Sequence, residues 1–285
     1  MPGLPDERAV LDRILHWGGR DEAVRLLVLT SSRARGDETV DLLSDYDVVV
    51  ASTDLAAFDP AAAYGPPLAR WGDEHLVHGV TTLFRGVVYE DGVKIDWTLW
   101  PAEVPALVAG HGLTDDLDVG YRVLLDKDGA AAEWPEAAYR AHVPAQPTEA
   151  EYLALVEEFW WSSTYVAKAL WRGEHLFADF VLAVDLRHGV LRRLLEWLVE
   201  VEHGWMLRPG AYGRGLEKLL PDDDARELAA TYEGAAGAEA FERTVVLFRR
   251  AARAVADGLG FAYPQRVDDL ASEHLRRVRA LPPRP

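Results

Sequence analysis

Residues 29–50, LTSSRARGDETVDLLSDYDVVV, decide the fold of the N-terminal half, because two buried runs meet a cluster of polar side chains there. Residues 26–29 and 48–50 are short apolar runs beside turn-forming residues, and each predicts a buried strand. Asp45 and Asp47 open the second run. Side chains two residues apart on a strand point to the same face, so we expect the two carboxylates to project together.

The acids and serines of this stretch predict a site for a metal ion and a nucleotide. Two carboxylates a few ångströms apart repel each other unless a cation lies between them, and carboxylate oxygens suit Mg²⁺. Ser31 and Ser32 follow the first strand, where hydroxyl and backbone N–H groups can bind phosphate. A third acid, Asp96, lies in the strand-like alternation of residues 93–100. An Asp-x-Asp pair alone is commonly structural, but three strand-borne acids beside a serine-rich turn favour the metal–nucleotide site.

This constellation resembles the nucleotidyltransferase superfamily, in which a Gly-Ser turn is followed by Asp-x-Asp and then by a distant Asp. Over residues 29–264 the chain is similar, more narrowly, to the aminoglycoside 6-adenylyltransferase (streptomycin adenylyltransferase) family. The motifs that carry the resemblance stand in the family's order: SSRARG (31–36), SDYDVVV (44–50), KIDWTLW (94–100), LLDKDG (124–129), EFWWSSTYVAKALWRGE (158–174) and GFAYP (260–264). The sequence departs from the family at Ser31, where the usual glycine lets the backbone approach a phosphate closely.

The resemblance implies an enzyme that transfers AMP from ATP to a hydroxyl of an aminoglycoside, namely the 6-hydroxyl of streptomycin, and releases pyrophosphate. Two Mg²⁺ ions would be bound by Asp45, Asp47 and Asp96, and Asp96 would also accept the proton of the attacking hydroxyl. Nucleotide contacts are expected from Ser31, Ser32, Arg33 and Lys168. Two alternatives stay open: transfer to a different hydroxylated amine or a protein side chain, and an inactive nucleotide-binding or antitoxin-like module.

The first half of the chain predicts a small domain with a sheet and helices. A helical pattern covers residues 6–18, and further strand patterns lie at residues 80–84, 86–89 and 121–125. Residues 51–70 are rich in alanine and proline and are expected to mix short helix with loop. We therefore expect a nucleotidyltransferase-type mixed β-sheet with helices over residues 1–134.

The second half predicts an all-α helical bundle, which makes the whole chain an α+β protein of two domains. Three prolines mark residues 135–147 as a linker. Residues 148–285 show only helical periods, and Thr148 with Glu151 forms a capping box at the start of the first helix. The next helix is expected over residues 175–203. ATP is expected to lie between the two domains.

Several side chains of the helical domain are candidates for contacts with the substrates. A core stripe on the first helix is predicted at Leu153, Val156, Trp160, Ala167 and Trp171. Glu157, Trp161, Thr164 and Lys168 share another face, where Lys168 is either half of a solvated pair or a contact of the β- and γ-phosphates. Asp179 and Asp185 on the following helix either pair with nearby arginines or line a polar cavity. With Glu157 and Trp161 they are the predicted acceptor contacts.

Composition sets the class of protein and of partner. The 285 residues are 49% hydrophobic and include no cysteine, which excludes disulfides and thiolate metal sites. The N-terminus shows no signal-peptide pattern, and no run approaches the ~18 apolar residues of a membrane span, so we expect a cytoplasmic protein without a membrane partner. A net charge of −17 disfavours nucleic acid and attracts a small cationic acceptor, although solubility alone also explains it. A monomer is favoured.

Overall fold

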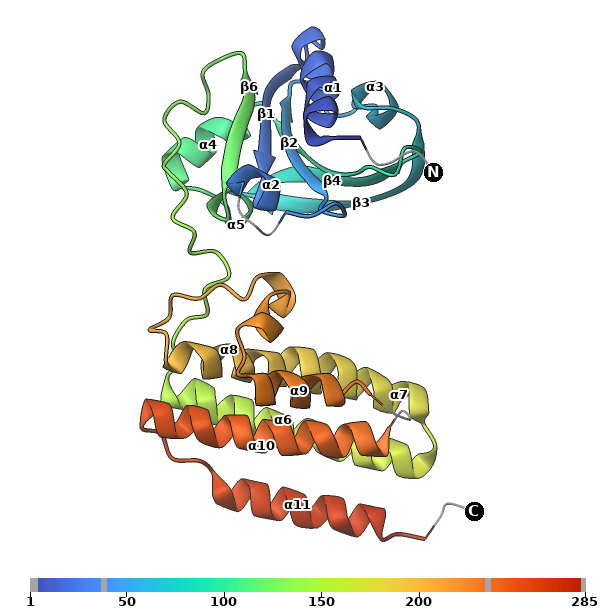
Figure 1. Cartoon of the computed structure of the whole chain (residues 1–285), viewed down its shortest axis with the longest axis vertical. Helices are drawn as coiled ribbons and strands as arrows, with labels where there is room; N and C mark the ends of the chain where they lie inside the picture. The colour runs from blue at the N-terminus through green and yellow to red at the C-terminus, as the bar shows by residue number, and fades with distance from the viewer. Residues whose placement is uncertain (1–4, 37–39, 234–236, 283–285) are drawn as a thin grey trace. The chain divides into compact units, whose positions relative to one another are not determined.

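The computed structural model describes residues 5–36, 40–233 and 237–282 (Figure 1). Contacts within the chain divide it into two compact units, Met1–Ala141 and His142–Pro285, and each is described by itself. The first unit contains a mixed sheet with helices and the second contains helices. The predicted α+β fold is therefore confirmed. Within the described residues, no helix is long and apolar enough to cross a membrane.

The first unit is built on a six-stranded sheet in the order β3-β4-β5-β2-β1-β6. Its strands are β1 (Val24–Thr30), β2 (Tyr46–Ser52), β3 (Pro67–Val77), β4 (Val80–Tyr89), β5 (Lys94–Pro101) and β6 (Tyr121–Asp126). The central pair, β2 and β5, is parallel, and the other neighbours are antiparallel. The sheet is thus mixed, as the sequence predicted.

Helices cover both faces of the sheet over its central strands (Figure 1). They are α1 (Glu7–Arg20), α3 (Pro60–Ala63), α4 (Val104–His111) and α5 (Asp115–Asp118). The first two pack with Val48 and Trp97 on what we call the α1 face. The other two pack with Val49 and Trp100 on the α4 face. Because side chains alternate along β2, Asp47 lies on the α4 face with Val49.

Strand β3 corrects the expectation that residues 51–70 mix only short helix and loop. Helix α3 and loops do occupy part of that range, but β3 begins at Pro67 and pairs with β4 from Tyr89 back to Val80. Residues 68–76 are all exposed, so the strand lacks the alternation of apolar and polar residues that marks a half-buried strand. The two runs predicted at 80–84 and 86–89 form one strand, β4.

The second unit is a set of packed helices around an apolar core. They are α6 (Glu149–Arg172), α7 (His175–Phe180), the π-helix η1 (Val181–Leu191), α8 (Arg192–Val201), the 3₁₀ turns η2 (Ala211–Gly213) and η3 (Leu216–Lys218), α9 (Asp222–Ala230), α10 (Ala238–Leu259) and α11 (Gln265–Arg279). The capping box of Thr148 and Glu151 is present at the start of α6. The helix expected over residues 175–203 is helical from His175 to Val201, but its middle is a π-helix rather than an α-helix.

One buried carboxylate ties α11 to the core of the second unit. Asp268 is 2% exposed, and its oxygens accept hydrogen bonds from Arg249 at 2.7 and 2.8 Å. The hydroxyls of Tyr263 and Ser272 donate to the same carboxylate at 2.8 and 2.9 Å. Burial opposes the charge of Asp268, but these donors outweigh it and hold the pKa of the carboxyl below its ordinary value. The carboxylate is thus buried, charged and fully partnered.

Candidate active site

The serine turn follows directly from the end of β1. Helix α2 (Ser31–Arg35) begins where β1 ends, and the backbone N–H of Ser31 donates to the carbonyl of Gly120 at 3.0 Å. Ser31 has a φ of +62°, in the left-handed region that favours glycine. The family's usual glycine would adopt this conformation without strain, whereas a serine there is strained. The side chain of this serine makes a hydrogen bond with Asp47, which a glycine could not make.

Strand pairing brings the three predicted acids together. Asp47 pairs directly with Asp96 across the parallel strands β2 and β5. Asp45 comes just before the first residue of β2, and its carboxylate lies close enough to Asp47 for the two charges to repel. Residues paired across neighbouring strands point to the same face, so Asp47 and Asp96 share the α4 face. The structure thus gathers the three carboxylates next to the serine turn.

A lysine that the sequence did not single out lies between two of these acids. The Nζ of Lys94 lies 2.5 Å from Oδ2 of Asp45 and 2.9 Å from Oδ2 of Asp96. Burial opposes the charge of Lys94, but the hydrogen bonds with both acids outweigh it and raise its pKa above the ordinary value. An ammonium group therefore stands where two carboxylates require positive charge.

Asp47 is the acid with the most perturbed ionisation. Burial raises its pKa to about 6, with further contributions from the charges of Asp96 and Asp45. The hydrogen bond from Ser31 and the charge of Lys94 act in the opposite direction and do not offset the increase. Near neutral pH the three acids hold negative charge that a single ammonium does not balance, and such a site attracts a further cation.

The side chains of this site are of the chemical type that binds a magnesium ion. Oδ1 of Asp96 is buried and has no hydrogen-bond partner among the residues that the structure describes, which leaves an oxygen with unused capacity to bind a cation or a proton. A carboxylate set without sulfur or imidazole is the type that Mg²⁺ prefers. Over the described residues, no three His, Cys, Asp or Glu side chains already stand in the arrangement of a metal centre. Since Lys94 bridges Asp45 and Asp96, its ammonium would have to move for a metal ion to bind there.

Arg33 has structural partners in this site. Its guanidinium donates to the carbonyls of Ser44 and Asp45 at 2.7–3.1 Å and lies 3.1 Å from Oε2 of Glu7. The same group lies over the ring of Tyr46, 4.0 Å from its centroid. These contacts hold the segment that carries Asp45 against α2. The side chain of Arg33, which is predicted as a nucleotide contact, is thus 8% exposed and makes its contacts within the first unit.

In the helical unit, the predicted residues Lys168 and Trp161 both contact the ring of Tyr165. The Nζ of Lys168 lies 4.5 Å from the centroid of the Tyr165 ring, and Trp161, which is 63% exposed, meets the same ring edge-on. Glu157 is exposed on α6, Asp179 is exposed on α7, and Asp185 is half-buried on the π-helix. Trp160 and the rest of the predicted core stripe are buried or pack against the core, apart from the half-buried Trp171.

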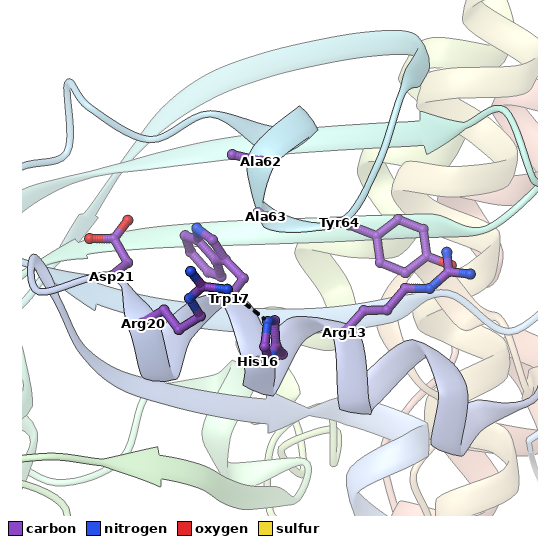
Figure 2. A pocket seen from close by; sticks show the side chains of 8 residues that line it. All are labelled: Arg13, His16, Trp17, Arg20, Asp21, Ala62, Ala63 and Tyr64. Carbon is purple, nitrogen blue, oxygen red and sulfur yellow. Dashed lines mark hydrogen bonds between the residues drawn. The ribbon is translucent and has the colours of Figure 1, made fainter.

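The first unit also contains a cavity of ≈ 510 Å³, which lies between α1 and α3 and so on the α1 face (Figure 2). Its charged side chains have partners: Arg13 pairs with Asp91 and lies over Tyr64, and Arg20 lies 3.3 Å from His16. The acids lie on the opposite, α4 face of the sheet. This cavity is therefore separate from the cluster of Asp45, Asp47 and Asp96.

Comparison with known proteins identifies the family. The sequence profile of the streptomycin adenylyltransferase family matches residues 5–278. The chain belongs to this family. It is similar to the aminoglycoside 6-adenylyltransferase of Campylobacter jejuni, with 27% identity over 97% of each chain. It is similar to that of Bacillus subtilis (strain 168) as well, with 28% identity over 92% of this chain and 94% of the relative. A crystal structure of an aminoglycoside 6-adenyltransferase from Bacillus subtilis covers 98% of this chain with 24% identity and a TM-score of 0.45.

Membership makes the chain an enzyme of the aminoglycoside adenylyltransferases and implies ATP as its co-substrate. Sequence reasoning assigned the acids and serines to the site but not Lys94, although it opens the motif KIDWTLW, and not Gly86, which pairs with Asp96 from β4. A signal for Lys94 was present, because the alternation of β5 places it on the same face as Asp96. No sequence signal gave the pairing of Gly86 with Asp96, since it depends on the register of two strands.

Proposed function

We propose that this enzyme transfers AMP from ATP to a hydroxyl of an aminoglycoside, with the 6-hydroxyl of streptomycin as the acceptor. The observation that carries the proposal is the pairing of Asp47 with Asp96, with Asp45 beside them and the serine turn at the end of β1. This arrangement concentrates negative charge next to hydroxyl groups. Family membership supports the class of reaction, and the names of the relatives support the position of transfer.

The side chains of the first unit divide the work of the reaction. The hydroxyls of Ser31 and Ser32 bind the phosphates of ATP. Asp45, Asp47 and Asp96 would hold magnesium, two ions in our proposal, and bound there it would supply positive charge to the phosphate oxygens. Asp96 accepts the proton of the acceptor hydroxyl at Oδ1, the oxygen for which the described part of the chain offers no hydrogen-bond partner. The hydroxyl oxygen forms a bond to the α-phosphorus while the bond to pyrophosphate breaks.

The helical unit supplies contacts for the substrates in this proposal. Lys168 balances the charge that develops on the leaving pyrophosphate. Glu157, Asp179 and Asp185 bind ammonium and guanidinium groups of the acceptor, for which carboxylates are natural partners, and Trp161 stacks on it. Asp185 is the least exposed of the three acids and should contribute most, because desolvated charge pairs are worth more than exposed ones.

Pyrophosphate release from ATP and Mg²⁺, with and without streptomycin, tests the proposal. We expect release to require streptomycin and to fall by about 10²–10⁴-fold in Asp96→Asn, which keeps the shape but loses the base. Asp12→Asn is the matched control, because Asp12 is an exposed acid of α1, the helix that packs on the other face of the sheet. Pyrophosphate release with another hydroxylated amine or with a protein, but not with streptomycin, would show that the acceptor is that compound and not streptomycin. No release with any acceptor would favour an inactive module.

A further inference from the structure

A row of paired residues crosses the sheet from the serine turn to an exposed tryptophan. Thr30, the last residue of β1, pairs with Asp47, and Asp47 pairs with Asp96. Asp96 pairs with Gly86 on β4, and Gly86 pairs with Trp71 on β3. Since directly paired residues point to the same face, Trp71 lies on the α4 face together with the acids.

The position between the acid and the tryptophan holds no side chain. A Cβ atom at Gly86 would lie 3.2 Å from Oδ1 of Asp96 and 3.2 Å from a ring carbon of Phe84. Neighbouring strands are about 4.8 Å apart, so the backbones at Asp96 and Trp71 are about 10 Å apart. Gly86 therefore lets the Asp96 carboxylate and the Phe84 ring approach each other closely, and the Phe84 ring in turn contacts the indole ring of Trp71.

Trp71 belongs to a group of side chains that we call the Trp71 platform, made of Trp71, Phe84 and Asp73. The rings of Trp71 and Phe84 meet edge-on, with centroids 5.5 Å apart. Asp73 pairs directly with Phe84, and residues 71 and 73 alternate to the same face. Trp71 is 63% exposed, and Asp73 is exposed as well. A large ring and a carboxylate thus face solvent beside the candidate active site.

The direction of the reaction places the acceptor on the side of the Trp71 platform. In phosphoryl and nucleotidyl transfer the attacking and leaving oxygens lie roughly in line on opposite sides of phosphorus. In the proposed reaction, Ser31 and Ser32 at the end of β1 hold the phosphates that leave. The attacking hydroxyl then approaches from the opposite direction along the row, where β4 and β3 lie beyond Asp96.

The geometry points to the Trp71 platform as a binding site for a cationic ring of the acceptor. This inference rests on the proposed AMP transfer. The Trp71 indole stacks on a sugar or guanidinium-bearing ring, and the Asp73 carboxylate pairs with its positive charge. A polycationic acceptor suits this pair of groups, whereas the triphosphate of ATP is repelled by Asp73. The platform would therefore determine affinity for the acceptor and leave affinity for ATP unchanged.

The test compares Trp71→Ala with Trp71→Phe and with Leu76→Ala. Leu76 is 71% exposed on the same strand and points to the opposite face, so it controls for loss of exposed apolar surface on β3. A cation–π contact is worth roughly 0.5–2 kcal/mol, so Trp71→Ala should weaken streptomycin binding about 2- to 30-fold. Trp71→Phe should restore most of the affinity, and Leu76→Ala should leave it unchanged. Calorimetric titration of streptomycin without ATP gives the affinity, and KM for ATP is measured separately.

The outcomes separate this inference from the proposed function. An unchanged streptomycin affinity in Trp71→Ala would overturn the acceptor site, even if the parent enzyme transfers AMP to streptomycin. An increase in KM for ATP in place of weaker streptomycin binding would place the ring against adenine and also overturn it. A parent protein that binds streptomycin through Trp71 but releases no pyrophosphate would refute the proposed function and support the platform. A parent protein without any streptomycin affinity would refute the platform as stated.

Discussion

Replacing Lys94 by methionine should increase the affinity of the nucleotide-free enzyme for a divalent metal. Lys94 makes ion pairs with Asp45 and Asp96 at 2.5 and 2.9 Å, and its side chain is 40% exposed. A half-exposed ion pair is worth about 0.5–1 kcal/mol after screening, so a metal that displaces both pairs loses about 1–2 kcal/mol. Methionine fills a similar volume without charge, and the variant should bind the metal about 5- to 30-fold more tightly.

Titration of Mn²⁺ into the nucleotide-free protein, followed by electron paramagnetic resonance of the free ion, measures this affinity without turnover. Lys218→Met is the matched control, because Lys218 is exposed on the 3₁₀ turn η3 of the helical unit. The control should bind Mn²⁺ like the parent. Equal or weaker binding by Lys94→Met would show that the ammonium does not compete with the metal and instead holds Asp45 and Asp96 in position for it.

Three further predictions concern ionisation, strain and a buried ion pair. Asp47→Asn should abolish AMP transfer yet stabilise the metal-free protein above pH 6. Ionising a carboxyl whose pKa is raised from 3.8 to about 6 costs up to about 3 kcal/mol, a cost that builds up as the pH rises from 3.8 to about 6 and is absent well below pH 3.8, where Asp47 is neutral in the folded and the unfolded state. A pH-independent difference in Tm would contradict this. Ser31→Gly should be more stable than Ser31→Ala by about 1–2 kcal/mol in urea unfolding, because alanine keeps the strained φ without the hydroxyl. Equal stabilities of the two variants would show that the backbone at residue 31 is not strained. Asp268→Asn should destabilise the helical unit by about 3 kcal/mol, because it leaves Arg249 without its buried partner, and an unchanged Tm would show that water replaces the pair.

The sequence predicted the composition of the site better than its geometry. Spacing alone placed Asp45 and Asp47 at the start of one strand and Asp96 within another, because alternation is a local property of a strand. Their direct juxtaposition depends on the register of β2 against β5, which no local pattern contains. The alternation of β5 puts Lys94 on the same face as Asp96, but its bridging position becomes visible only when Asp45 is brought close to it from the start of β2.

Two parts of the fold escaped prediction for different physical reasons. Strand β3 buries no residue between 68 and 76, so the sequence there shows no alternation of apolar and polar residues from which its pairing with β4 could be predicted. The helix expected over residues 175–203 was correct in extent, but apolar period does not distinguish a π-helix from an α-helix over a stretch as short as Val181–Leu191. Trp71 was passed over for the first reason, since an exposed tryptophan outside a recognised strand has no face to which it can be assigned.

The position of β3 at the end of the sheet has a consequence for colloidal behaviour. The outer edge of an end strand offers backbone donors and acceptors to any extended segment of another molecule, and an exposed, partly apolar edge is a place where aggregation starts. On this strand the charged residues Arg70 and Glu74 lie between the exposed apolar residues Leu68, Trp71 and Leu76. Removing those two charges should leave the fold intact and shorten the time that a concentrated solution stays clear.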